Sequence, residues 1–231
     1  MQIHGLNKTT LLDYPEHVAA TIFTGGCNFR CPFCHNSDLV INPMSQPLIA
    51  EEEILEFLQK RTNILSGVCI TGGEPTLQAD LPDFIRRVKG MGYLVKLDTN
   101  GYRPEVLKNL IKENLLDYIA MDIKSGPAGY ALASGMPDID FEKINESIDF
   151  IMHCGVQYEF RTTVVRGIHE KSDFEEIALL IQGCRAYFLQ NYKDNEKVLM
   201  PGFESFSKEE LEDFADILRP YIKRVELRGI E

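Results

Sequence analysis

The chain has 231 residues, 44% hydrophobic and 26% charged, so it can bury a sizeable core and is not expected to be disordered. Its net charge of −11 argues against nucleic acid as a partner, because nucleic-acid surfaces need clustered Lys and Arg. The sequence shows no signal peptide and no apolar run of membrane-spanning length, so we expect a cytoplasmic protein without a membrane partner.

Short apolar runs that predict strands alternate with stripes of apolar residues at helical spacing. The predicted strands are 18–23, 68–70, 94–97, 118–121, 158–165, 186–189 and 224–227. The predicted helices follow Glu51, Pro82 and Pro104 and include residues 144–152, 177–181 and 211–218. This alternation predicts an α/β fold with parallel strands, namely a partial (β/α)6 barrel of the TIM type. Residues 1–231 show no linker or repeat, so we expect a single domain.

Glycines and polar residues follow four successive predicted strands. These segments are 24–27 (Thr-Gly-Gly-Cys), 71–75 (Thr-Gly-Gly-Glu-Pro), 98–101 (Asp-Thr-Asn-Gly) and 122–124 (Asp-Ile-Lys). In parallel β/α folds the chemistry gathers at the carboxyl ends of the strands. The four segments are therefore predicted to form one shared site.

Cys27, Cys31 and Cys34 have the spacing C-x3-C-x2-C, which suits several kinds of site. Covalent haem attachment matches residues 31–35 (Cys-Pro-Phe-Cys-His), but it is normally an export-side process. A redox dithiol explains Cys31 and Cys34 but leaves Cys27 unexplained. A zinc site needs His35 as its fourth ligand, which its adjacency to Cys34 would strain. Three thiolates can also hold an iron–sulfur cluster with one iron left open.

The cysteine triplet, followed by Gly72-Gly73-Glu74-Pro75, resembles the radical S-adenosylmethionine (SAM) enzymes. Residues 34–36 (Cys-His-Asn), 98–101 and 121–124 (Met-Asp-Ile-Lys) resemble the branch that activates glycyl radical enzymes. Residues 12–15 (Leu-Asp-Tyr-Pro) and 23–31 look most like the activating proteins of anaerobic ribonucleoside-triphosphate reductase. The resemblance extends over roughly residues 5–200.

This resemblance implies that Cys27, Cys31 and Cys34 hold one 4Fe-4S cluster, whose open iron binds SAM. Reductive cleavage of SAM would give a 5′-deoxyadenosyl radical, which installs a glycyl radical on a partner enzyme. The expected partner is anaerobic ribonucleotide reductase, and the expected electron donor is a flavodoxin or a ferredoxin. The alternatives are another glycyl radical enzyme, of the pyruvate formate-lyase type, or a small-molecule substrate.

The resemblance also assigns contacts to SAM. Gly72, Gly73 and Glu74 would lie at its methionine amino group, because glycines let the backbone approach a ligand. A tight turn between a strand and a helix explains the two glycines equally well. Phe33 is expected beside the adenine or as a shield of the cluster, and Asn36 contacts the ligand or caps a turn.

Oxygen-bearing groups follow two of the strands. Asp98, Thr99 and Asp122, together with the Met121 carbonyl, resemble the monovalent-cation site of the pyruvate formate-lyase activating enzyme, and oxygen ligands suit such a cation. Lys124 and Arg161 resemble contacts to the ribose or the carboxylate of SAM. The alternative for Arg161 is a position at a solvated strand edge.

Gln190 marks a departure from the pyruvate formate-lyase activator, which has a histidine on the corresponding strand. This difference leaves the target enzyme open. Residues 36–67 contain no cysteine, so we expect no ferredoxin-like insert of the kind that some activators of this branch have. The remaining cysteines, Cys69, Cys154 and Cys184, are isolated in apolar surroundings and are expected to be buried rather than to form a second cluster.

Overall fold

In the computed structural model, which describes residues 1–230, eight strands follow one another through one sheet in sequence order. The strands are β1 (Ile3–Thr10), β2 (Ala19–Thr24), β3 (Gly67–Gly72), β4 (Leu94–Thr99), β5 (Tyr118–Asp122), β6 (Gln157–Val164), β7 (Tyr187–Asn191) and β8 (Val225–Arg228). The pairs β2–β3, β3–β4, β6–β7 and β7–β8 are parallel, whereas β1 runs antiparallel to β2. The predicted α/β fold with a largely parallel sheet is confirmed.

Helices connect the strands at all six predicted places. The α-helices are α1 (Ser37–Ile41), α2 (Glu51–Gln59), α3 (Leu81–Gly90), α4 (Pro104–Lys112), α5 (Tyr130–Ser134), α6 (Phe141–His153), α7 (Lys171–Leu180) and α8 (Lys208–Leu218), and the 3-10 turns are η1 (Pro43–Ser45) and η2 (Pro75–Leu77). Residues in the first turn explain where two of these helices, α2 and α8, begin. Three glutamates complement the dipole at the start of α2, and Ser207 and Glu210 form a capping box at α8.

Strand β1 and the short helices α1 and α5 were not predicted. β1 contains Gly5 and a run of exposed residues, and its pairing with β2 is interrupted by two register shifts. Such a strand lacks the regular alternation of apolar and polar residues on which sequence prediction depends. The two helices have five residues each, which is too short for a helical stripe.

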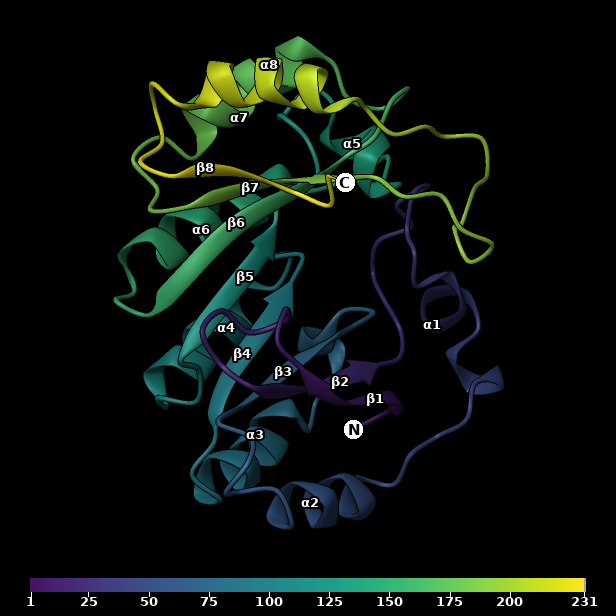
Figure 1. Cartoon of the computed structure of the whole chain (residues 1–231), viewed down its shortest axis with the longest axis vertical. Coiled ribbons are helices and arrows are strands. Elements are labelled where there is room, and N and C mark those ends of the chain that lie inside the picture. The colour runs from purple at the N-terminus through teal and green to yellow at the C-terminus, as the bar shows by residue number, and fades with distance from the viewer. Residues whose placement is uncertain (231) are drawn as a thin grey trace. The chain divides into compact units, whose positions relative to one another are not determined.

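The chain divides into two compact units. The first unit comprises Met1–Asn28, Asp38–Thr99 and Glu105–Ile119, and the second comprises Phe29–Ser37, Asn100–Pro104 and the chain from Ala120 onward. In the first unit α2 packs on α3, and α3 packs on β4 (Figure 1). In the second unit α7 and α8 lie side by side, and α8 contacts β7 and β8 (Figure 1).

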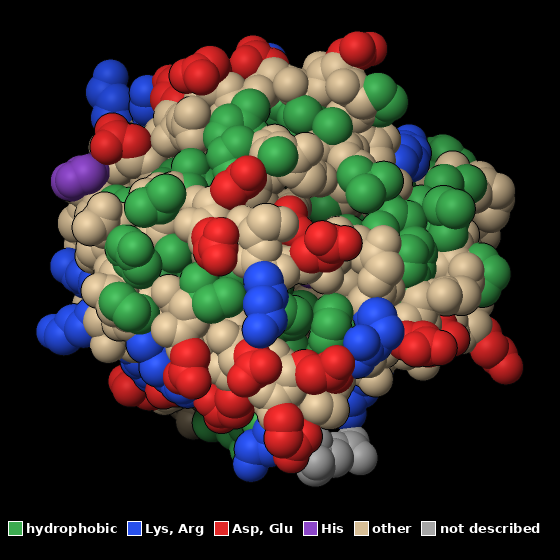
Figure 2. Space-filling view, turned by 90° about the horizontal axis from the view of Figure 1, so that it is seen from above, with side chains coloured by type: hydrophobic (Ala, Val, Ile, Leu, Met, Phe, Trp, Pro, Cys, Tyr) green, Lys and Arg blue, Asp and Glu red, His purple; other side chains and the backbone are tan. Residues whose placement is uncertain are grey.

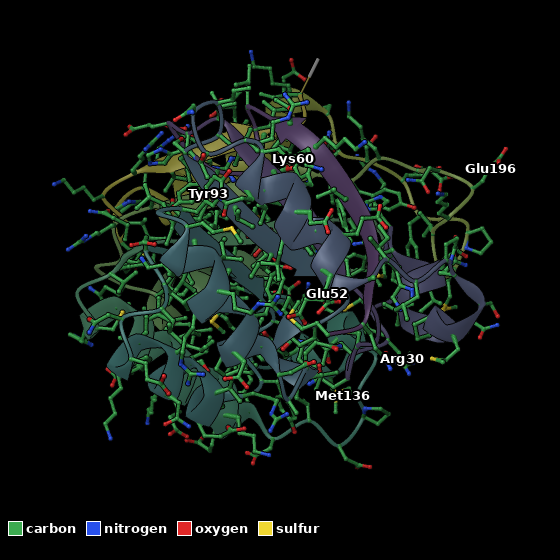
Figure 3. All side chains as sticks on the ribbon, turned by 90° about the horizontal axis from the view of Figure 1, so that it is seen from below. Arg30, Glu52, Lys60, Tyr93, Met136 and Glu196 are labelled. Atoms are coloured by element: carbon green, nitrogen blue, oxygen red, sulfur yellow. The ribbon has the colours of Figure 1, made fainter. Side chains whose placement is uncertain are left out.

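A side-chain hydrogen bond ties two elements of the first unit together. The Tyr93 hydroxyl, labelled in Figure 3, donates a hydrogen bond to the Leu58 carbonyl over 2.8 Å and so anchors the end of α2 to the segment before β4. On the face shown in Figure 2, basic side chains are separated by acidic and apolar ones. Within residues 1–230, no helix has the length and hydropathy needed to cross a lipid bilayer.

Candidate active site

The glycine turn after β3 packs on the backbone that leads to Cys27. The Gly73 N–H donates to the Thr24 carbonyl over 2.8 Å, and the Glu74 N–H donates to the Gly26 carbonyl over 2.8 Å. A Cβ added to Gly73 would lie 2.0 Å from the Gly26 carbonyl oxygen, so a side chain cannot fit without a shift of the backbone. Close approach of two backbone segments therefore explains Gly73, and it fixes the turn just before the first cysteine.

Glu74 is a buried carboxylate held by three donors. Its Oε1 accepts hydrogen bonds from the Thr76 N–H over 3.1 Å, from the Thr76 hydroxyl over 2.6 Å and from the Thr99 hydroxyl over 2.8 Å. Glu74 is only 1% exposed, and buried carboxylates need such partners. The structure thus brings together the predicted site residues Glu74, which follows β3, and Thr99, which ends β4.

Asp98 lies on the same strand as Lys96, and the two form a buried ion pair. Residues two apart on a strand point to the same face, so this pairing follows from the local geometry. The sequence analysis overlooked Lys96. A charged residue inside an otherwise apolar strand, two positions before a predicted ligand, was the signal that could have identified it.

Cys31 and Cys34 lie in the second unit, and the chain after β7 holds their loop. The Cys34 N–H donates to the Cys31 carbonyl over 3.0 Å. The Leu199 N–H donates to the Cys34 carbonyl over 3.1 Å, and the Met200 N–H donates to the Pro32 carbonyl over 2.9 Å. Backbone hydrogen bonds therefore tie the loop of these two cysteines to a segment more than 150 residues away in sequence.

Helix α5 supports the same loop from another side. The Arg30 N–H donates to the Ser134 carbonyl over 2.9 Å. Gly135 follows α5 in the left-handed backbone region, with a φ of 65°, which favours glycine. A Cβ at this position would also lie 2.1 Å from the Arg30 carbonyl oxygen, so no other residue fits without a shift of the backbone. Figure 3 labels Arg30 and Met136, which mark the two sides of this contact.

The contacts of His35 and the environment of Cys31 bear on the alternative metal and redox sites. The His35 Nε2 lies 2.5 Å from the Lys193 carbonyl oxygen, and its ring stacks on Tyr192 at 5.3 Å between centroids. These contacts disfavour His35 as a zinc ligand.

Burial raises the pKa of the Cys31 thiol to about 11, although the Lys124 ammonium opposes this shift. A redox dithiol depends on a lowered thiol pKa, which the burial of Cys31 opposes.

Asp122 and Lys124, at the end of β5, form a charged cluster with Arg161 in the middle of β6. The Arg161 Nε donates to Asp122 Oδ1 over 2.5 Å, and the Lys124 Nζ donates to Asp122 Oδ2 over 2.9 Å. Burial would raise the pKa of Asp122, but the positive charges of Arg161 and Lys124 outweigh it and hold that pKa well below its usual range. Arg161 is therefore a partner of Asp122, with a side chain 20% exposed, rather than a residue at a solvated edge.

His169 connects this charged cluster to Phe33. Its Nδ1 accepts a hydrogen bond from the Val165 N–H over 3.0 Å, so the proton lies on Nε2, which donates to the Lys124 carbonyl over 2.7 Å. Burial lowers the pKa of His169, which is 3% exposed. The Phe33 ring meets the His169 ring edge to face at 6.0 Å, so Phe33 is a buried neighbour of the loop after β6.

Gln190, Asn36 and Cys27, the other predicted site residues, differ in how far they are exposed. Gln190 is exposed on β7 and pairs in register with Thr163, so it points to the same face of the sheet as Arg161. Asn36 is half-buried just before α1, and Cys27 is half-buried in the first unit.

Thiols and a buried hydroxyl are the kinds of donor that a cluster and a polar ligand use, but among residues 1–230 no three His, Cys, Asp or Glu side chains lie close enough together to hold a metal ion. All six cysteines are free thiols, and three of them carry the predicted motif. The Tyr130 hydroxyl is fully buried beside the Lys124 backbone, and within residues 1–230 no hydrogen bond of ordinary length and angle holds it. A polar ligand group would satisfy it. A monovalent cation fits less well, because Asp98 and Asp122 are already paired with lysine and arginine side chains.

Comparisons with known proteins agree with this chemistry. The sequence model of the Radical SAM superfamily matches residues 21–181. A Methanocaldococcus jannaschii protein, named as a glycyl-radical enzyme activating enzyme, is 33% identical over 99% of this chain and 96% of its own length. The pyruvate formate-lyase-activating enzyme of Clostridium pasteurianum is 28% identical over 80% of this chain and 77% of its own length.

A solved structure bears on the fold. Streptococcus suis SuiB bound to S-adenosylmethionine has a TM-score of 0.70 at 12% identity. The match covers 88% of this chain and 48% of SuiB, so this chain spans about half the length of that protein. The likeness confirms the predicted partial barrel. The chain belongs to the radical SAM superfamily, in the branch of the glycyl-radical enzyme activating enzymes.

Proposed function

We propose that this protein cleaves SAM reductively and installs a glycyl radical on a partner enzyme, and that the partner is anaerobic ribonucleoside-triphosphate reductase. One observation carries the activating function. A relative named as a glycyl-radical enzyme activating enzyme is similar over 99% of this chain, a span that includes the segment of the cysteine motif. The motifs at residues 12–15 and 23–31, which resemble the reductase activators, support the choice of partner.

In this proposal Cys27, Cys31 and Cys34 hold a 4Fe-4S cluster and leave one iron for SAM. When bound, the cluster supplies the electron that breaks a sulfonium C–S bond of SAM and yields methionine and a 5′-deoxyadenosyl radical. The turn at Gly73 and the hydrogen bonds to residues 199 and 200 keep the cysteine loop in place. An external flavodoxin or ferredoxin provides the electron.

The second half of the reaction is a hydrogen-atom transfer. A Cα–H bond of a glycine in the partner breaks, and the hydrogen atom passes to the 5′-deoxyadenosyl radical. The products are 5′-deoxyadenosine and a glycyl radical, so one electron and one SAM are consumed for each radical made. The site must exclude water and competing side chains during this transfer, because so reactive a radical attacks what it meets.

The charges in the second unit suit one end of SAM. Asp122 carries one negative charge, and Lys124 and Arg161 carry two positive charges, so the cluster has a net charge of plus one. Such a cluster favours an anionic group, and the methionine carboxylate is the anionic group of SAM. The Tyr130 hydroxyl, buried near the start of α5, is a further donor to the ligand.

The remaining contacts follow the family resemblance. Gly72, Gly73 and Glu74 approach the methionine amino group through the backbone, and the Thr99 hydroxyl supports Glu74. Phe33 shields the adenine or the cluster, and its buried ring suits that role.

Two more residues complete the proposed ligand set. Asn36 follows the cysteine loop directly. Gln190 shares a face of the sheet with Arg161, which suits a contact to the same ligand. The family model extends through both units, which supports a single radical SAM domain over residues 1–231.

A pyruvate formate-lyase-type enzyme is the second candidate partner, because a pyruvate formate-lyase-activating enzyme is among the relatives. The experiment mixes the reduced, cluster-loaded protein and SAM with each candidate enzyme from the same organism. Electron paramagnetic resonance then detects the glycyl radical. A radical on the reductase alone supports the proposal, and a radical on the lyase alone supports the second candidate. Formation of 5′-deoxyadenosine with a radical on neither would overturn the choice of a protein substrate.

A further inference from the structure

Lys96 is a lysine buried in the middle of β4, with 2% of its surface exposed. Lysine is almost never buried without a partner, because removing an ammonium group from water is costly. Its Nζ forms an ion pair with Asp98, which is itself 9% exposed. The Lys96 ammonium also lies 6.0 Å from the centre of the Tyr118 ring, within the range of a cation–π contact.

Sheet register places a third group beside this pair. Cys69 on β3 pairs in register with Lys96, and its Sγ lies 3.8 Å from Lys96 Nζ and 3.7 Å from Asp98 Oδ1. Alkali cations prefer several oxygen ligands, and a thiol is a soft ligand that they bind poorly. The Cys69 thiol, which lies beside the Asp98 carboxylate, is therefore a poor ligand for an alkali cation.

The charge of Lys96 weighs further against such a cation. A monovalent ion on Asp98 would stand within a few ångströms of a buried ammonium, where repulsion between like charges is strong. Asp122, the second carboxylate that the family resemblance assigns to a cation, is already paired with Lys124 and Arg161. Each carboxylate thus has cationic side chains of this chain as partners.

We propose that the Lys96 ammonium supplies the positive charge that a dissolved monovalent cation would otherwise bring to Asp98, so the enzyme works without Na⁺ or K⁺. The part of this inference that concerns catalysis rests on the proposed radical SAM function. Lys96 is then a positioning residue that holds the Asp98 carboxylate in a charge-neutral pair. An ammonium fixed on the chain has the same unit charge as Na⁺ or K⁺ and does not depend on the salt in the medium.

The test compares the wild type with Lys96→Met, which keeps a long unbranched side chain and removes the charge. Each protein is assayed for thermal unfolding and for 5′-deoxyadenosine formation in choline, sodium and potassium chloride at equal ionic strength. We expect the wild type to be the same in all three salts. In Lys96→Met, K⁺ or Na⁺ should raise both the midpoint of unfolding and, by about tenfold, the rate of SAM cleavage. Crystals soaked in Tl⁺ should show an anomalous peak at Asp98 in Lys96→Met only.

Lys89→Met is the matched control, because Lys89 forms another Lys–Asp pair in the same unit, with Asp117 at 2.7 Å. It should gain no dependence on the cation. Lys96→Arg retains the positive charge and should stay independent of the cation, which covers the case in which Lys96→Met does not fold. A wild type that K⁺ or Na⁺ stimulates severalfold, or that binds Tl⁺ at Asp98, overturns the proposal. If no variant cleaves SAM, the proposed function fails, while the unfolding and Tl⁺ measurements still decide the role of Lys96.

Discussion

At Gly73 the glycine turn after β3 packs on the backbone just before Cys27. Replacing Gly73 with alanine places a Cβ 2.0 Å from the Gly26 carbonyl oxygen, a backbone atom that cannot move without shifting the turn. We expect Gly73→Ala to lower the free energy of unfolding by about 1–3 kcal/mol, as overpacking does elsewhere. Urea unfolding of the metal-free protein measures the change.

Gly90 provides the control for this prediction. It ends α3, and a Cβ added there meets nothing within 4 Å. Gly90→Ala should leave stability unchanged or raise it by up to about 1 kcal/mol, because alanine favours the helix. Equal effects of the two substitutions would show that the contact with Gly26 does not limit this position.

His169 makes stability depend on pH in a defined direction. Burial lowers its pKa in the folded protein, so below the ordinary histidine value of about 6.5 the unfolded chain binds a proton that the folded chain does not. The free energy of unfolding should therefore fall as the pH drops from 6.5, by at most about 1.4 kcal/mol per pH unit from this residue.

The matched variants for this prediction are His169→Gln and His153→Gln. His153 is on α6 with 72% of its side chain exposed. The dependence between pH 6.5 and 5 should become shallower in His169→Gln and stay as in the wild type in His153→Gln. A slope that His169→Gln leaves unchanged would contradict a neutral, buried His169.

Sequence reasoning could identify site residues where the residue types carry the chemistry. Cys27, Cys31, Cys34 and the segment 72–75 were found in this way, and Glu74 and Thr99 do lie together. It missed Lys96 and Tyr130, because their importance comes from burial and from neighbours on other strands or loops. The apolar strand around Lys96 was a local signal of its burial, whereas no local pattern in the sequence reports that the Tyr130 hydroxyl is buried.

At the scale of elements, α7 and α8 depend on an aromatic contact. Phe174 and Phe214 stack with 4.5 Å between ring centroids and an interplanar angle of 19°, and both rings are buried. Phe214→Ala should lower the free energy of unfolding by about 3–5 kcal/mol, because it removes a buried ring and leaves a cavity. Leu179→Ala, on α7 but 64% exposed, should change it by less than about 0.5 kcal/mol. Similar losses in urea unfolding would contradict this packing.

The elements show why some parts of the fold were predictable. The helices after Glu51, Pro82 and Pro104 combine a start signal with an apolar stripe, and each begins within one residue of that signal. Strand β1 has neither, because as an edge strand it needs to bury little of its surface. Its pairing with β2 is long-range information that the residues of β1 do not display.

At the scale of the whole molecule, acidic residues dominate the charge, which is −11. The predicted site residues nevertheless include a cluster with a net positive charge, formed by Asp122, Lys124 and Arg161. Overall charge therefore says little about which ligand the site prefers, and the local arrangement of charges decides it. The superfamily followed from the resemblance of the motifs and the parallel α/β fold from the sequence pattern, whereas this local charge balance required the structure.

The account depends most on the three-cysteine site, and SAM cleavage tests it most directly. The wild type, Cys31→Ala and Cys154→Ala are loaded with iron and sulfide without oxygen, reduced with dithionite and incubated with SAM. We predict that the wild type and Cys154→Ala, whose thiol lies at the end of α6 outside the motif, form 5′-deoxyadenosine, and that Cys31→Ala forms none. A wild type that binds zinc without iron and forms no 5′-deoxyadenosine, or a Cys31→Ala variant as active as the wild type, would contradict the account.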